Sequence, residues 1–282
     1  MLRNVLLICF YVFTLSACHS PPDRPSRETV LAQNPEFSAF LNHVDHQPVY
    51  GVQVGEHCDA AVLFIHGTPG GWGALQYFMS DTELQNKANL ISVDRPGFGQ
   101  SSSEEAITSL EEQARLILES ALAQHPGPFV LVGHSYGGPI ELQIAIDAPD
   151  NVASLIILAG PADPDLHHPR WYHRMGNTWL GRRLTSEPLN RATDEMLDLR
   201  ENLEAQAERL GGIAKKTTII QGGKDWLVPP DNVAYMRQHL TAADLDIVEL
   251  HEQNHFLPWN EHDLIKQKIL EHLGDQHCGD SG

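Results

Sequence analysis

The chain has 282 residues, of which 41% are hydrophobic, enough to fill the core of one large domain. Its 37 acidic residues outnumber its 19 Lys and Arg residues, which gives a formal net charge of −18 at pH 7. Such a charge repels nucleic-acid phosphates and anionic membrane surfaces, so we expect no nucleic-acid partner. It favours instead the interpretation of a solvated acidic surface that keeps the protein soluble.

The first residues have the pattern of an export signal, in which one Arg precedes an apolar run too short to span a bilayer reliably. The end of this run, Leu15-Ser16-Ala17-Cys18, resembles the cleavage box of bacterial lipoproteins. The resemblance implies that residues 1–17 are a signal peptide, that Cys18 carries acyl chains, and that residues 18–35 are a tether. An ordinary secretory signal, with Cys18 incidental, is the alternative.

The lipoprotein resemblance also implies a location. The residue after Cys18 is His19 rather than an aspartate. In this position the chain resembles lipoproteins that are passed on to the outer membrane. We therefore expect a lipid-anchored protein of the bacterial cell envelope, held at the outer membrane and facing the periplasm, with the anchor as its membrane contact.

Cysteine usage follows from that location. Cys9 would leave with the signal peptide and Cys18 would be acylated, so only Cys58 and Cys278 remain in an oxidising compartment. They form either a disulfide, which would pin the C-terminal tail across the sheet edge, or two unconnected surface thiols.

Strand and helix patterns alternate along most of the chain. This alternation predicts an α/β fold with a mostly parallel, doubly wound sheet, and ligands bind such sheets at the carboxyl ends of the strands. The expected strands span residues 49–54, 61–65, 90–93, 129–132, 155–158, 217–221 and 246–250, and the expected helices span residues 75–84, 107–124, 139–147 and 262–273.

The stretch between Gly160 and Thr217 is too long for a simple connection between strands, so residues 161–215 are expected to form a helical lid. Its second half predicts an acidic amphipathic helix over residues 193–210. Its first half is rich in aromatic residues, which either pack the lid onto the core or contact substrate: Trp171, Tyr172 and Trp179. Three histidines of the segment lack a carboxylate or cysteine at ligand spacing, so we expect no metal there: His167, His168 and His173.

A G-x-S-x-G pattern follows the apolar residues 129–132 and precedes a helix. This arrangement is typical of a strained strand-to-helix turn that lifts a serine hydroxyl above the sheet, with Gly133, Gly137 and Gly138 as the small neighbours it needs. Ser135 is therefore the candidate nucleophile, and an ordinary loop serine is the alternative.

A serine nucleophile needs a base and an acid that orients the base, and both are expected in loops after later strands. Asp225 is the candidate acid, with Asp163 as its rival in the loop after an earlier strand. His255 is the candidate base among 16 histidines, with His251 as its close rival.

Two backbone N–H groups are candidates for the oxyanion hole. Tyr136 follows the nucleophile at the start of a helix, where the helix dipole is positive. Thr68 lies in the Gly-rich segment of residues 66–71, whose glycines allow the backbone to approach a substrate closely.

From about residue 60 to residue 273 the chain resembles the serine hydrolases of the α/β-hydrolase fold. The resemblance rests on His66-Gly67-Thr68-Pro69, on the Asp94 to Ser101 segment, on the Ser135 turn, and on the Asp225 and His255 loops. It implies a sheet of about eight strands, with residues 36–160 and 216–275 as the core. In this family the Asp94 segment is a turn that shapes the sheet edge, so we expect its role to be structural.

These expectations combine into a two-step acyl transfer without a cofactor, acting on a small-molecule substrate. A carboxylic ester hydrolase is the first reading. The Gly-rich loop, despite Thr68, is also similar to that of proline iminopeptidases. A haloperoxidase or carbon–carbon bond hydrolase remains open. Epoxide hydrolases and haloalkane dehalogenases of this fold use an aspartate nucleophile, so Ser135 argues against both. A catalytically idle envelope binding lipoprotein is the alternative of another class. The oligomeric state and the physiological substrate stay open.

Overall fold

The computed structural model describes residues 27–55, 58–103, 106–274 and Cys278. The expected signal peptide, Cys18 and the first part of the expected tether lie outside the described residues. The described residues before Phe37 belong to a unit of their own, in which helix α2 (Arg27–Gln33) falls within the expected tether. Within the described residues, no helix is both long and apolar enough to cross a membrane.

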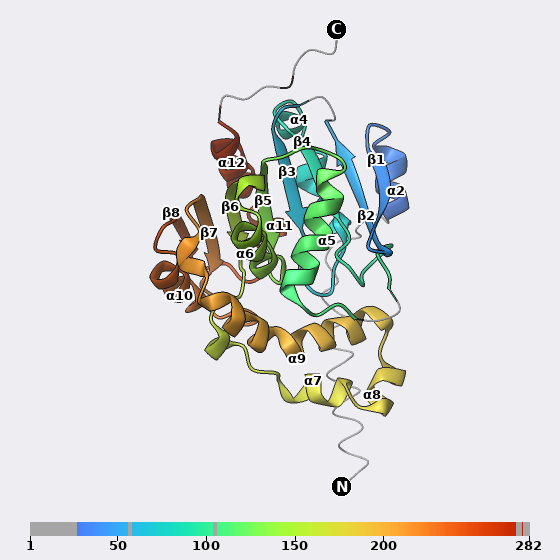
Figure 1. Ribbon diagram of the computed structural model, residues 1–282, viewed down its shortest axis with the longest axis vertical. Helices are drawn as coiled ribbons and strands as arrows, with labels where there is room; N and C mark the ends of the chain where they lie inside the picture. The colour runs from blue at the N-terminus through green and yellow to red at the C-terminus, as the bar shows by residue number, and fades with distance from the viewer. Residues whose placement is uncertain (1–26, 56–57, 104–105, 275–277, 279–282) are drawn as a thin grey trace. The chain divides into compact units, whose positions relative to one another are not determined.

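The second unit, which begins at Phe37, is built on one eight-stranded sheet with the order β1-β2-β4-β3-β5-β6-β7-β8 (Figure 1). Strand β2 is antiparallel to both β1 and β4, and all other neighbours are parallel. This confirms the predicted fold class. The strands are β1 (Ser38–Val44), β2 (Gln47–Val54), β3 (Ala61–Ile65), β4 (Asn89–Val93), β5 (Phe129–His134), β6 (Val152–Leu158), β7 (Lys216–Gly222) and β8 (Asp244–Leu250).

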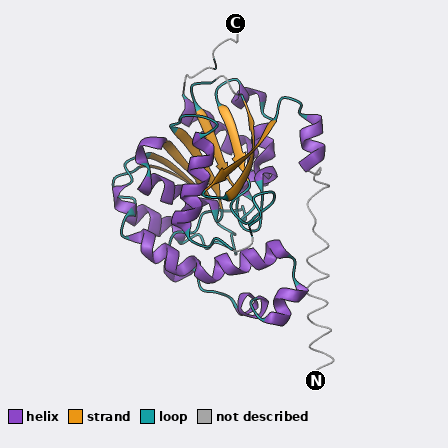
Figure 2. Cartoon of the chain, turned by 45° about the vertical axis from the view of Figure 1, so that its right-hand side comes forward, coloured by secondary structure: helices purple, strands orange, loops and turns teal. Residues whose placement is uncertain are grey.

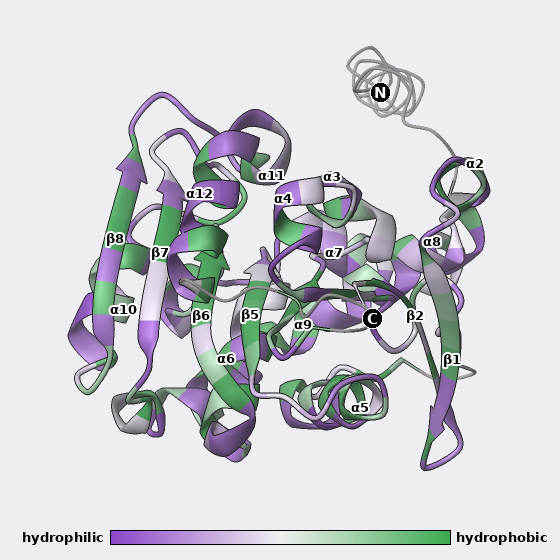
Figure 3. Ribbon diagram, turned by 90° about the horizontal axis from the view of Figure 1, so that it is seen from above, coloured by the Kyte–Doolittle hydropathy of each residue, from purple (hydrophilic) through white to green (hydrophobic). Residues whose placement is uncertain are grey.

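Helices cover both faces of the sheet (Figure 2). Helices α5 and α6 pack against each other on one side, and α12 packs with α3 and α4 on the other (Figure 3). Every residue of β3, β4 and β5 is buried, as expected for apolar strands covered on both faces. The helices outside the insertion are α3 (Gln76–Met79), α4 (Thr82–Gln85), α5 (Leu110–Leu122), α6 (Gly137–Asp147), α10 (Asn232–His239), α11 (Leu257–Asn260) and α12 (His262–Leu273), with short 3-10 turns η2 (Trp72–Leu75), η3 (Pro149–Asn151), η4 (Pro164–Leu166) and η5 (Leu210–Gly212).

Three helices fill the insertion between β6 and β7: α7 (Trp171–Gly176), α8 (Trp179–Leu184) and α9 (Glu187–Ala207). Helix α9 runs along the lower edge of the sheet in Figure 1, and α7 and α8 lie on its far side. Helix α9 begins and ends earlier than the helix predicted over residues 193–210. The buried side chains of α9 include Leu199 and Leu203, so its apolar face is its attachment to the core.

Two expected helices differ in extent. Residues 75–84 do not form one helix, because Asp81 accepts hydrogen bonds from the N–H groups of Glu83 and Leu84 and starts α4 anew. Helix α5 begins at Leu110, after Ser109, whose side chain accepts from Glu112 N–H, and so is shorter than residues 107–124.

The two cysteines expected to survive processing are joined, because Cys58 and Cys278 form a disulfide. The backbone N–H of Cys278 also donates to the carbonyl of Asn86 at 3.1 Å. Together these contacts hold Cys278 beside Cys58, in the loop from β2 to β3, and beside Asn86 at the end of α4.

Candidate active site

The turn between β5 and α6 carries Ser135 in a strained backbone conformation, with φ at +54°. Few residues other than glycine adopt this region without support from their surroundings. Here the Ser135 N–H donates to the carbonyl of Leu158 at 2.9 Å, and the Ser135 carbonyl accepts from Gly138 N–H at 2.9 Å. These bonds tie the turn to β6 and to the first turn of α6.

Neighbouring backbone comes unusually close to this turn. A Cβ added to Gly67 would lie 2.8 Å from the Cβ of Ser135, and one added to Gly137 would lie 2.2 Å from the carbonyl oxygen of Ile65. A larger residue at either position would collide, so these glycines allow the Gly67 loop to lie against Ser135.

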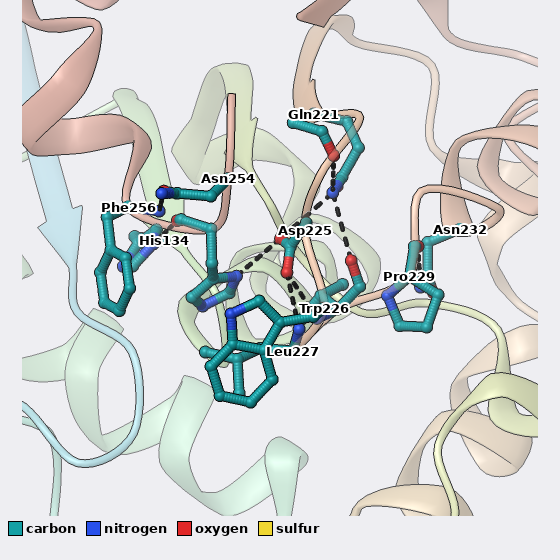
Figure 4. Close-up of polar contacts among 12 residues, drawn as sticks. His134, Gln221, Asp225, Trp226, Leu227, Pro229, Asn232, Asn254 and Phe256 are labelled. Carbon is teal, nitrogen blue, oxygen red and sulfur yellow. Dashed lines mark hydrogen bonds and ion pairs between the residues drawn. The ribbon is translucent and has the colours of Figure 1, made fainter. Parts of the chain in front are cut away.

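The loops after β7 and β8 bring Asp225 and His255 together. Figure 4 shows Asp225 with two of its other partners, Gln221 and Leu227. The Nδ1 atom of His255 lies 2.7 Å from Oδ2 of Asp225, and both side chains are buried. The carboxylate also accepts from the N–H groups of Leu227 and Val228 at 2.9 Å each, and from Nε2 of Gln221 at 3.2 Å. Because a carboxylate can only accept, Nδ1 carries the hydrogen, and Nε2 of His255 is left as the basic nitrogen.

His134, the residue before Ser135, connects the His255 loop to the nucleophile turn. Its Nε2 lies 3.0 Å from the carbonyl oxygen of His255, and the two rings are 5.0 Å apart between centroids. Burial, and then the neighbouring His255, lowers the pKa of His134 to about 3. The ring is therefore neutral at neutral pH and donates from Nε2. This hydrogen bond holds the backbone of His255 next to His134, one residue before Ser135.

The two rival residues occupy other positions. His251 is exposed in the turn directly after β8. The side chain of Asp163 accepts from Asp165 N–H at 2.9 Å and caps the short turn η4. The structure thus pairs His255 with Asp225 rather than with Asp163.

The two candidate oxyanion donors lie on either side of the nucleophile. Tyr136 follows Ser135 directly, and Thr68 follows Gly67, whose Cα region touches Ser135. Among the hydrogen bonds of the described residues, none uses the backbone N–H of Thr68 or of Tyr136. The hydroxyl of Thr68 is also buried and has no hydrogen-bond partner among the residues that the structure describes. Both N–H groups are therefore free to bind an oxygen that develops negative charge.

Comparison with known proteins identifies the family of this fold. Residues 62–265 match the profile of the alpha/beta hydrolase family. The chain belongs to the alpha/beta hydrolase family.

Among curated relatives of this α/β hydrolase, the proline iminopeptidase PfmaB of Pestalotiopsis fici is 25% identical over 261 residues, which are 75% of this chain and 91% of that protein. Solved structures share its fold. An esterase from Exiguobacterium antarcticum is 19% identical with a TM-score of 0.65, over 84% of this chain and 99% of the other. A bacterial membrane phospholipase A is 19% identical with a TM-score of 0.62, over 97% and 98%.

A buried ion pair, which the sequence did not reveal, contacts the Gly-rich loop of residues 66–71. Arg95 binds Glu195 of α9 through two nitrogen–oxygen contacts of 2.6 and 3.0 Å, and both side chains are almost fully buried. Gln113 of α5 contacts both partners, at 2.6 Å from Arg95 and 2.9 Å from Glu195. The pair therefore links the turn after β4, helix α5 and the insertion.

The guanidinium group of Arg95 also contacts residues on both sides of Ser135. Arg95 donates to the carbonyl of Gly67 at 3.2 Å, and its Cζ lies 4.7 Å from the ring centroid of Tyr136 and 4.7 Å from that of Phe98. It thereby fixes the residue before Thr68 and the side chain of Tyr136. Only the position of Arg95 next to Asp94 pointed to this region in the sequence, where we expected a structural role.

The structural expectation for Asp94 agrees with its contacts. Its carboxylate accepts from the N–H groups of Trp72 and Gln100 at 2.8 Å each. Its carbonyl accepts from the hydroxyl of Ser101 at 2.7 Å. Asp94 thus closes its own turn and anchors the end of the Gly-rich loop.

Proposed function

We propose that this α/β hydrolase is a serine hydrolase that cleaves a carboxylic ester of a small or medium substrate through an acyl-enzyme. Ser135 attacks the ester carbonyl after His255 takes its proton, and the N–H groups of Thr68 and Tyr136 bind the oxyanion. His255 then protonates the leaving alcohol, and it activates the water that releases the acid. Asp225 holds the imidazole in the required tautomer.

The observation that carries the proposal is the 2.7 Å contact between His255 and Asp225, two buried side chains whose loop is bonded to the turn of Ser135 through His134. A surface histidine would not need a buried carboxylate that is itself held by two backbone N–H groups. This arrangement supports a base whose orientation is set before substrate binds.

An aminopeptidase is the second candidate, because one relative is named a proline iminopeptidase. Such an enzyme must bind the α-ammonium group of its substrate, which requires a carboxylate whose charge is not already neutralised. Glu195, the buried acid beside the oxyanion loop, is paired with Arg95 and Gln113. We therefore favour a neutral ester over an N-terminal peptide bond.

The remaining expectations complete the proposal. Helices α7 to α9 act as the lid whose side chains shape the pocket. Cys18, which lies outside the described residues, carries the acyl anchor that keeps the enzyme at the outer membrane of the bacterial envelope.

Pre-steady-state kinetics test the proposed function. With p-nitrophenyl esters in excess, an acyl-enzyme predicts a rapid release of about one p-nitrophenol per protein molecule before the steady state. Ser135→Ala removes the burst, and it lowers turnover by about 10⁴-fold or more. Proline p-nitroanilide is tested in parallel, and faster turnover of the anilide than of every ester would select the aminopeptidase instead.

A further inference from the structure

The outer helices of the insertion expose large apolar side chains. On α7 and α8 six of them are between 41% and 77% exposed: Trp171, Tyr172, Met175, Trp179, Leu180 and Leu184. Single exposed apolar residues are normal on a protein surface, whereas a cluster on two adjacent helices marks an interaction site. Of the two roles left open for Trp171 and Trp179, packing onto the core does not agree with their exposure of 69% and 72%.

Packing within the insertion directs these side chains outward. Helix α7 contacts both α8 and α9, and α9 buries its own apolar face toward the core. In Figure 1, α7 and α8 lie on the side of α9 that faces away from the sheet. We call residues 170–184 the outer hairpin.

The charge of the outer hairpin is opposite to that of the rest of the chain. Residues 166–186 contain no Asp or Glu, in a chain with 37 acidic residues. They contain four arginines: Arg170, Arg174, Arg182 and Arg183. Arg182 is paired with Asp194 of α9, and Arg183 lies over the ring of Trp179 at 5.2 Å from its centroid. Arg174 and Arg183 are both exposed.

We propose that the outer hairpin docks onto the anionic surface of a phospholipid bilayer. Trp, Met and Leu side chains insert at the boundary between headgroups and acyl chains, while the arginines bind phosphate groups. A nucleic acid would use the cations but not the exposed leucines, and an apolar protein groove would not need the arginines. A bilayer surface uses both.

The net charge of −18 gives this docking a direction. Anionic lipids repel the chain as a whole, which has a net acidic charge, whereas the hairpin segment without acidic residues attracts them, so the orientation with the hairpin toward the lipid is favoured. Because α9 lies between the hairpin and the sheet, that orientation turns the insertion toward the bilayer. The proposal concerns a second binding activity and does not depend on which bond the enzyme cleaves.

Tryptophan fluorescence tests the docking on the full chain. Residues 1–35 contain no Trp, so insertion of that segment by itself gives no quenching. The protein is titrated with vesicles of brominated phosphatidylglycerol or brominated phosphatidylcholine. Insertion predicts quenching, with half-maximal quenching at an about tenfold lower concentration of the anionic lipid. Trp171→Phe/Trp179→Phe should abolish most of the quenching and so locate it.

Two variant pairs separate the apolar and the charged contribution. Leu180→Ser/Leu184→Ser removes two of the apolar side chains that insert, and Arg174→Glu/Arg183→Glu reverses two charges. Each pair should raise the concentration of anionic lipid that gives half-maximal quenching about tenfold or more. The matched controls are Leu41→Ser, an exposed leucine of β1, and Lys215→Glu/Arg237→Glu, which changes the net charge equally elsewhere. Thermal melts show whether each variant is folded.

Three results would overturn the proposal. The first is no quenching by the anionic vesicles, and the second is equal half-maximal concentrations for the two lipids. The third is a dimer in sedimentation velocity that is lost in Leu180→Ser/Leu184→Ser, without any quenching, because the hairpin would then bind a second copy of this chain.

Discussion

At the scale of single residues, the account depends on how Asp225 holds His255. The carboxylate faces Nδ1 of His255 at 2.7 Å and is itself bonded to two backbone N–H groups. Asp225→Asn keeps the shape but offers an amide, which favours the wrong tautomer of the imidazole. Ester turnover at neutral pH should fall about 10⁴-fold while the fold is retained.

Asp163→Asn is the matched control, because Asp163 was the rival acid in the sequence and its side chain accepts from Asp165 N–H in its own turn, away from His255. Its turnover should equal that of the unchanged protein. Loss of activity in Asp163→Asn with retention in Asp225→Asn would reverse the assignment.

The buried His134 makes stability depend on pH. Burial is the main cause that lowers the pKa of His134 to about 3, whereas a histidine in the unfolded chain has a pKa of about 6.5. Between these values the unfolded chain binds the extra proton, so the stability contribution is complete above pH 6.5 and is lost as the pH falls. In His134→Gln, the decline in the free energy of unfolding between pH 6 and 4.5 should be shallower by up to about 1.4 kcal/mol per pH unit.

Urea denaturation at several pH values measures this slope. His251→Gln, which removes an exposed histidine, is the control and should keep the slope of the unchanged protein. An identical slope in His134→Gln would show that His134 does not stay neutral in the folded protein.

At the scale of secondary-structure elements, Arg95 connects α9 to the Gly-rich loop of residues 66–71, because it binds both Glu195 and the Gly67 carbonyl. Glu195→Gln leaves a buried guanidinium group without a counter-charge, which should lower the free energy of unfolding by about 3–5 kcal/mol. Glu201→Gln, on the exposed side of the same helix, should change it little. Chemical denaturation compares the two, and equal stabilities would mean that the pair contributes no net attachment of α9.

Elements were predictable where the local pattern was strong and were missed where it was not. The central strands are continuous apolar runs because both faces are buried. Strand β1 (Ser38–Val44) was missed, because as an edge strand it buries only Val44, and its apolar run of residues 39–41 is short. Helix α10 was also missed, since its eight residues carry only a weak periodic pattern.

Site residues were predictable for a similar reason. Ser135 lies in a motif defined by its neighbours, and Asp225 and His255 follow from chain order and strand ends. The pairing of Arg95 with Glu195 joins residues 100 positions apart and leaves no local pattern. The role of His134 depends on a contact with a loop 121 residues away.

At the scale of the whole molecule, the disulfide between Cys58 and Cys278 closes most of the chain into one loop, with a sequence separation of 220. Constraining the unfolded chain in this way should contribute about 2–5 kcal/mol. Cys58→Ser/Cys278→Ser should therefore melt at a lower temperature than the oxidised protein. Reduction of the unchanged protein should lower its melting temperature toward that of the variant. Identical melting temperatures with and without reductant would contradict this contribution.

The most direct measurement for the account as a whole is the site of reaction with a fluorophosphonate, which modifies only a serine that a neighbouring base has activated. The oxidised, folded protein is treated with the probe, digested, and analysed by peptide mass spectrometry. The account predicts one adduct, on Ser135, formed far more slowly in Asp225→Asn and absent in His255→Ala. No adduct on the folded protein, or an adduct on another serine, would contradict it.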